Sequence, residues 1–202
     1  MLKRIFLLLL AVCTISLVTL TTSCFGHLYP NEPSDPFIKL FTKAIDGNVK
    51  IHMDDWTDVH GDIFSFLVPP EFTVKFDMGD SLECADIGFQ GIIVGKILVG
   101  ESNESQPISF VIEDLVNLYL EKFGDYEILE SFRGYVHGNS MNIRALDFSG
   151  QLCWMVLISE SRNLDSFGQG EFLVFIGLVE RNQTEQWADW YTGMLITLLE
   201  LR

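Results

Sequence analysis

Apolar and polar residues alternate along several stretches after residue 60, which is the pattern of half-buried strands. Over residues 72–76 every second side chain is apolar. The pattern predicts strands over residues 63–68 and 72–76, joined at a Pro69-Pro70 turn. The glycine-punctuated stretch 87–99 is predicted to be a central strand with a bulge at a glycine.

Residues 108–123 change to the period of an amphipathic helix, which Gly124 would end. Two short turns, 137–139 and Ser149-Gly150, and a loop over 162–170 then separate four stretches that indicate an antiparallel meander. These predicted strands are 126–136, 140–148, 151–159 and 171–179. A closing helix would begin near Asn182, with Glu185 completing a capping pattern. Its apolar stripe would cover the sheet and consists of Trp187, Trp190, Tyr191, Met194, Leu195, Leu198 and Leu201.

The first part of the chain is different. Residues 1–23 have a basic start and an apolar run, the layout of a secretory signal peptide. Residues 24–36 are rich in proline and polar residues and are predicted to be a tether. Residues 37–59 are interpreted as a short helix, capped by Ser34 or Asp35, followed by an acidic loop.

The end of the signal peptide, Leu20-Thr-Thr-Ser-Cys24, resembles the lipobox of bacterial lipoproteins. In that family a diacylglycerol is attached to the cysteine, here Cys24, which becomes the first residue of the mature chain. Two alternatives stay open at this point. Cleavage after Gly26 would release a soluble exported protein, and an uncleaved apolar run would act as an anchor, although about 16 residues is short for a bilayer.

Three stretches carry a second resemblance: Phe64–Phe72, Gly134–Phe148 and Glu171–Leu178. With the order of the predicted elements, they are similar to the PsbP-like superfamily, which includes the bacterial DcrB-like lipoproteins. The resemblance covers residues 60–202. It implies an α+β fold, an antiparallel β-sheet meander covered by helices in an α/β/α sandwich, and a non-enzymatic role as an accessory or binding domain.

Acidic residues dominate the charge: 28 acidic against 13 basic residues give a formal net charge of −15. Such a surface repels phosphate backbones, so nucleic acid is not an expected partner. Solubility explains the charge, and a cationic partner is the alternative reading. Of the four cysteines, Cys84 and Cys153 remain beyond the signal peptide and Cys24, and export permits a disulfide between them. A buried free thiol is the alternative for Cys153.

Chemical motifs are scarce. The sequence has no nucleophile elbow, P-loop, zincin helix or dinucleotide fingerprint, and it indicates no cofactor. A weak set of metal-ligand candidates is crowded before the first strand: His52, Asp54, Asp58, His60 and Asp62, with Asp55 between them. A solvated acidic loop is the simpler interpretation. Trp56 in this loop would be either an exposed contact residue or a cover over the sheet edge.

Together these features predict a lipoprotein of the cell envelope, lipid-anchored to a membrane and facing the periplasm or exterior. Its expected role is non-enzymatic binding or assembly support for an envelope protein partner. The alternatives are a periplasmic metal-dependent hydrolase that uses the His52–Asp62 cluster, and a small-ligand carrier with a groove between the closing helix and the sheet.

Overall fold

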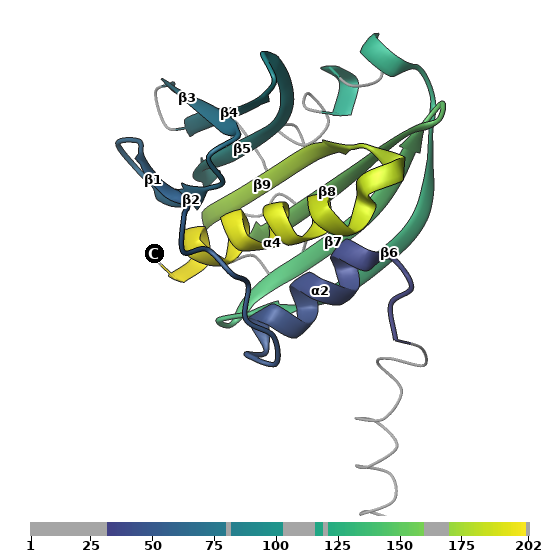
Figure 1. Cartoon of the computed structure of the whole chain (residues 1–202), viewed down its shortest axis with the longest axis horizontal. Coiled ribbons are helices and arrows are strands. Elements are labelled where there is room, and N and C mark those ends of the chain that lie inside the picture. The colour runs from purple at the N-terminus through teal and green to yellow at the C-terminus, as the bar shows by residue number, and fades with distance from the viewer. Residues whose placement is uncertain (1–31, 80–81, 103–115, 119–120, 160–169, 201–202) are drawn as a thin grey trace, which may run out of the picture. The chain divides into compact units, whose positions relative to one another are not determined.

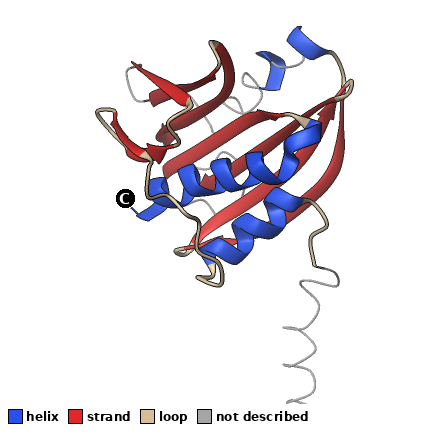
Figure 2. Ribbon diagram, viewed as in Figure 1, coloured by secondary structure: helices blue, strands red, loops and turns tan. Residues whose placement is uncertain are grey.

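Seven antiparallel strands form the centre of the computed structural model (Figure 1), in the order β3-β4-β5-β9-β8-β7-β6. They are β3 (Phe72–Met78), β4 (Leu82–Phe89), β5 (Ile92–Ser102), β6 (Tyr126–Val136), β7 (Asn139–Phe148), β8 (Gln151–Ser159) and β9 (Gly170–Val179). Two helices, α2 (Pro36–Ile45) and α4 (Thr184–Glu200), lie side by side over one face of this sheet (Figure 2). The predicted α+β fold with an antiparallel sheet covered by helices is therefore confirmed.

The described residues are 32–79, 82–102, 116–118, 121–159 and 170–200. The chain divides into two units, Met1–Glu32 and Pro33–Arg202. The predicted signal peptide and Cys24 lie outside the described residues. No helix in the described ranges is both long enough and apolar enough to cross a membrane.

The four strands predicted for the meander match β6 to β9 to within a residue. Their turns contain residues in the left-handed region, His137 at φ 49° and Ser149 at φ 48°, each followed by a glycine that also has positive φ. Two consecutive positive φ values give the turn whose twist matches paired antiparallel strands. His137 is thus a turn residue.

The single central strand predicted over 87–99 is wrong. The chain turns back at Gln90-Gly91, where φ is 51° and 81°, and forms the hairpin β4–β5. The bulge expected at a glycine does occur, because the register shifts between Ile87 and Gly88. A glycine-rich apolar run has the same composition whether it continues or reverses, so the pattern did not reveal the turn.

Two further predictions near the Pro69-Pro70 turn need correction. Part of the expected acidic loop is a strand, β1 (Thr57–His60), which pairs with β2 (Ser65–Val68) in a separate two-stranded sheet. The strands on either side of the two prolines are not partners, since β2 pairs with β1 and β3 pairs with β4. The small sheet is attached to α4, where Thr197 Oγ1 accepts a hydrogen bond from the Leu67 N–H at 3.0 Å.

Helix α2 begins as predicted, with Asp35 as its N-cap. One Asp35 carboxylate oxygen accepts hydrogen bonds from the N–H groups of Phe37 and Ile38, and the other accepts from Trp154 Nε1, each at 3.0 Å. Burial raises the pKa of Asp35, although these hydrogen bonds act in the opposite direction. Phe37 stacks on Trp154 with a centroid distance of 4.8 Å, which attaches the helix to β8.

The strand β6 holds the residues just before α2. Glu130 accepts hydrogen bonds from the Ser34 N–H, the Ser34 hydroxyl and the Asp35 N–H at 2.7 to 3.0 Å. The last residues of the predicted tether therefore belong to the folded unit, which begins at Pro33. This start lies well before the predicted boundary at residue 60, because the α2 side chains complete the core.

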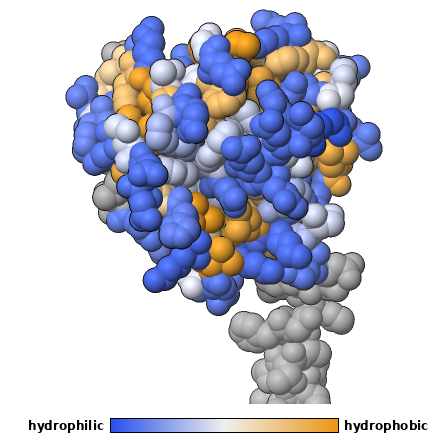
Figure 3. Space-filling view, in the orientation of Figure 1, coloured by the Kyte–Doolittle hydropathy of each residue, from blue (hydrophilic) through white to orange (hydrophobic). Residues whose placement is uncertain are grey.

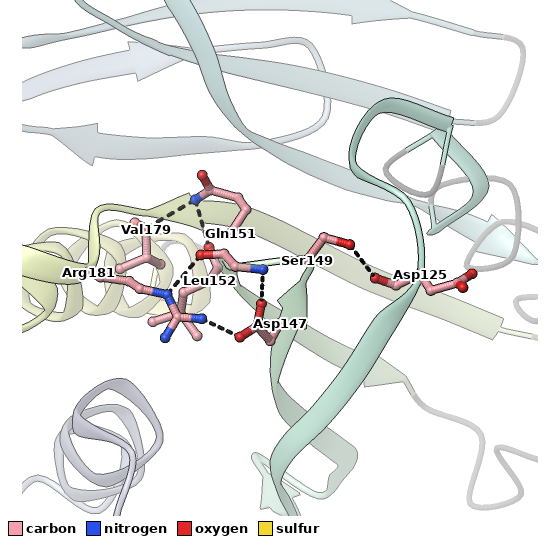
Figure 4. Close-up of polar contacts among 8 residues, drawn as sticks. Asp125, Asp147, Ser149, Gln151, Leu152, Val179 and Arg181 are labelled. Carbon is pink, nitrogen blue, oxygen red and sulfur yellow. Dashed lines mark hydrogen bonds and ion pairs between the residues drawn. The ribbon is translucent and has the colours of Figure 1, made fainter.

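The closing helix begins later than the capping pattern indicated. Asn182 lies inside a short 3-10 turn, Arg181–Gln183, and α4 starts at Thr184. Arg181 fixes this start from the sheet side (Figure 4): it donates to the Gly150 carbonyl at 2.8 Å and pairs with the Asp147 carboxylate. The turn between β7 and β8 thereby holds the beginning of α4.

Aromatic rings fill the space between α4 and the sheet. Tyr191 from α4 meets Trp154 and Phe175 from the strands and Trp187 from its own helix, and all four are at most 1% exposed. The ligand groove expected between the closing helix and the sheet is therefore replaced by close-packed core in this region.

The other face of the sheet also has helical cover. Residues 116–118 and 121–123 are helical, and Val116 and Phe123 pack against Leu146, Phe148 and Met155. Gly124 follows with φ 85°, which agrees with its predicted place at the helix end. The rest of the predicted 108–123 helix lies outside the described residues.

Candidate functional site

The candidate metal ligands do not converge. His52 lies 3.5 Å from Asp54, and His60 lies 3.1 Å from Asp58, as two separate exposed pairs. Asp62 is exposed in the loop beyond β1. Across the described ranges, no group of three or more His, Cys, Asp or Glu side chains is arranged to hold a metal ion. The geometry thus gives the metal-dependent hydrolase no centre in this cluster.

A buried carboxylate holds the loop between β1 and β2. Glu83, 1% exposed on β4, accepts hydrogen bonds from the consecutive N–H groups of Asp62, Ile63 and Phe64 at 2.6, 2.8 and 3.1 Å. Gly61 lies against the same carboxylate, and a Cβ there would be 2.3 Å from Glu83 Oε1. Three converging N–H groups form an anion-binding concavity, and here the protein's own glutamate occupies it.

Cys84 and Cys153, for which the sequence permitted a disulfide, are both free thiols. Cys84 lies on β4 and Cys153 on β8, with β5 and β9 between them. Three strand spacings amount to about 14 Å, beyond the Cα separation that a disulfide spans. Burial raises the pKa of Cys153 to about 12, as expected of an inert core thiol.

A surface groove lies where the acidic segment crosses α4. It has two adjoining parts, of about 430 and 370 Å³, that share the side chains of His52, Trp56 and Trp190. The larger part is completed by Asp54, Asp55, Pro69, Pro70 and Glu71, and the smaller part by Leu40, Val49, Lys50, Ile51, Gln186 and Asp189. The groove therefore combines residues from four distant stretches of the chain.

The Trp56 ring lies against α4 at Gly193, where the helix carries no side chain. A Cβ on Gly193 of α4 would lie 2.4 Å from Trp56 Cη2, so only glycine lets the indole ring lie directly on the helix. The backbone of the segment turns at this point, with the Trp56 N–H donating to the Met53 carbonyl at 3.1 Å. Trp56 is half-buried and covers α4, where the cover alternative had expected the sheet edge. A role as a contact residue stays a prediction.

Trp190 is held by three other rings. Its centroid lies 5.1 Å from Phe72, 5.6 Å from Phe89 and 5.4 Å from Trp187. The turn at Pro69, whose carbonyl accepts the Phe72 N–H at 3.0 Å, positions this edge of the cluster. Trp190 was predicted as part of the core stripe, but it is half-buried and lines both parts of the groove.

Charge at the groove is mainly negative. The exposed carboxylates of Asp54, Asp55, Glu71 and Asp189 surround the two tryptophans, with Lys50 as the basic residue of the lining. The pKa of Asp189 is raised, chiefly by partial burial and also by the nearby charge of Glu185. Figure 3 shows that the face viewed in Figure 1 is mostly hydrophilic, with hydrophobic residues in separate groups. The arrangement has the features of a recognition surface, with aromatic rings at its base and carboxylates at its edge.

The fold and the groove define an α+β protein with a helix-covered antiparallel sheet and an aromatic surface site. No family model matches the chain, and no curated protein matches its sequence.

Comparison with solved structures gives similarities at low identity. The Ran-binding protein Mog1p of Saccharomyces cerevisiae has 13% identity and a TM-score of 0.42 over 75% of this chain and 95% of its own. A mutant form of the protein Mog1 has 13% identity and a TM-score of 0.39, covering 72% and 94%. Protein PA94 of Pseudomonas aeruginosa, of unknown function, has 10% identity and a TM-score of 0.32, covering 69% and 93%. Similarities at this level carry no information on the activity of this chain.

Proposed function

We propose that this protein is a non-enzymatic binding domain of the cell envelope that holds a segment of a partner protein in the Trp56–Trp190 groove. The observation that carries the proposal is the pair of half-buried tryptophans in a surface groove that exposed polar side chains also line. Tryptophan is enriched where proteins bind one another, because its large ring contributes contact area at little conformational cost. The PsbP-like assignment stays a prediction and is consistent with an accessory role.

Attachment to the envelope is the second part of the proposal. It is supported by the basic start, the apolar run and the Leu20-Thr-Thr-Ser-Cys24 sequence, and Cys24 is the proposed lipid attachment site. The prolines between Cys24 and Pro33 favour an extended spacer. A lipid-anchored domain of this kind would meet envelope proteins from the periplasmic or exterior side of the membrane.

Crosslinking in a bacterial host tests both parts on the full chain. A photo-reactive amino acid at position 186, in the groove, is compared with one at position 127, an exposed site on β6. Each is placed in the natural chain and in Cys24→Ser, with fatty-acid labelling of the same cultures. We expect label only when Cys24 is present, and a discrete protein adduct from position 186 but not from position 127.

The two parts of the proposal, the lipid anchor and the groove, can be refuted separately. A chain that is unlabelled with Cys24 intact would overturn the lipid anchor and leave the groove untouched. Equal adducts from positions 186 and 127, or none from position 186, would overturn the groove as the binding site.

A further inference from the structure

We propose that the occupant of the groove is a basic peptide segment, with arginine or lysine side chains placed over Trp56 and Trp190. This inference rests on the function proposed above and specifies the chemistry of the partner. It follows from the charge of the groove, the state of its carboxylates and the character of its aromatic base.

The carboxylates of the groove are not neutralised by lysine or arginine from the described chain. In this part of the protein, neither residue type forms an ion pair with Asp54, Asp55, Glu71 or Asp189. Lys96 pairs with Asp86 and Arg181 pairs with Asp147, both away from the groove. A row of like charges left together repels itself, and a ligand of opposite charge relieves that repulsion when it binds.

The base of the groove suits a cation as well as an apolar group. Trp56 and Trp190 are both half-buried and line both parts of the groove. Tryptophan is the side chain that attracts cations most strongly over its face, and a guanidinium group also stacks on it as a plane. A basic side chain can thus place its charge between ring and carboxylate while its aliphatic stem contacts the ring.

The size and division of the groove favour a peptide over a single small cation. The two parts, of about 430 and 370 Å³, meet at the tryptophans, and each has at least one carboxylate of its own. An extended chain that crosses this junction can place successive side chains in the two parts. Lipid headgroups and nucleic acids carry phosphate, which the same carboxylates repel.

Titration with synthetic peptides tests the inference on the purified full chain. The probes are three nine-residue peptides that differ only at four positions, which carry arginine, glutamine or glutamate, and tryptophan fluorescence reports binding. We expect the arginine peptide to bind at least tenfold more tightly than the glutamine peptide, and the glutamate peptide not to bind. The affinity for the arginine peptide should fall as salt is raised.

A matched pair of triple variants assigns the binding to the groove. Asp54→Asn/Asp55→Asn/Glu71→Gln removes three groove charges, and Asp125→Asn/Glu127→Gln/Glu180→Gln removes three exposed charges elsewhere. All six positions are exposed, so both variants keep the core intact. We expect the groove variant to bind the arginine peptide at least tenfold more weakly and the control variant to bind it within about twofold of the natural chain.

Each of the other outcomes refutes a specific part of the inference. Equal weakening by the two variants would show that net charge, and not the groove, attracts the peptide. The three peptides could bind equally, and this binding could be lost in a chain crosslinked at position 186. That result would refute the basic partner but keep the groove as a binding site. Failure of the arginine peptide to bind would refute the inference, while the crosslinking in the host still decides the proposed function.

Discussion

Gly193 offers a direct test of how the groove is built. It lies in the buried part of α4, and a Cβ at this position would be 2.4 Å from Trp56 Cη2, 2.7 Å from Trp56 Cζ3 and 3.2 Å from Ile51 Cγ2. Carbon atoms that are not bonded prefer separations of roughly 3.5–4.0 Å. The variant Gly193→Ala would therefore force the indole ring off the helix.

Two opposing effects decide the change in unfolding free energy. Alanine in place of glycine inside a helix contributes about 1 kcal/mol of stability. The displaced half-buried indole would expose about 100 Å² of apolar surface, roughly half of what a tryptophan buries, which costs about 2.5 kcal/mol at 25 cal/mol per Å². The loss exceeds the gain, and we expect Gly193→Ala to destabilise the protein by about 1.5 kcal/mol.

Urea denaturation of four chains measures this: the natural chain, Gly193→Ala, Trp56→Ala and the double variant. Without the indole ring, the alanine methyl group no longer meets its main obstacle and the helix propensity decides the outcome. Gly193→Ala should then stabilise the Trp56→Ala chain by about 1 kcal/mol, so the sign of the effect reverses. If Gly193→Ala stabilised both chains equally, the proposed seat of Trp56 on α4 would be refuted.

Three further predictions concern other parts of the fold. Glu83→Ala should lower the unfolding free energy by about 3–5 kcal/mol, because three backbone N–H groups lose a charged acceptor; Glu83→Gln should cost less, and equal costs in chemical denaturation would contradict the hydrogen-bond account. The Cys153 thiol should resist iodoacetamide at about pH 8 in the folded protein and react in guanidinium, since burial raises its pKa to about 12; peptide mass spectrometry checks this, and rapid labelling of the folded chain would show that the site opens. For Glu130, burial acts to raise the pKa but the hydrogen bonds from Ser34 and the Asp35 N–H lower it overall. A depressed carboxyl pKa stabilises the fold above the unfolded pKa and loses that contribution as pH falls through the folded pKa. The stability difference between the natural chain and Glu130→Gln should therefore be full at about pH 7 and shrink once the pH falls below 4.5; a difference of constant size in denaturation curves down to acid pH would contradict the assigned ionisation.

Local sequence patterns were sufficient where neighbouring residues determine the structure. The strands β6 to β9 follow from strand-like apolar stretches, two of whose boundaries are short glycine turns, and α2 follows from Asp35, Pro36 and the apolar spacing after them. The same patterns failed at two other local hairpins, β4–β5 and β1–β2. The reversal at Gln90-Gly91 lies inside a glycine-containing apolar run, and β1 lies in an acidic stretch without clear alternation, so the patterns revealed neither hairpin.

The groove could be predicted only in part, because its lining comes from separate stretches of the chain. Trp56 was predicted to be either a contact residue or a cover, and the structure shows it as a half-buried cover of α4. Its position depends on Gly193, far along the chain in α4, and Trp190 was assigned to the core stripe by its helical spacing. Helical periodicity places a residue on a face of the helix, but it does not show where that face ends and the surface begins.

The acidic residues themselves separate into two groups once the fold is known. The carboxylates of Asp35, Glu83 and Glu130 accept hydrogen bonds from backbone N–H groups and fix the chain segments that carry those groups. Among the described contacts, the carboxylates of Asp54, Asp55, Glu71 and Asp189 accept no hydrogen bond from a backbone N–H group. All four nevertheless line the groove with the two tryptophans. Solubility requires negative charge somewhere on the surface, but it does not require that the charge collect beside half-buried aromatic rings. That coincidence of carboxylates and indole rings is what distinguishes a recognition surface for a basic segment from an acidic coat.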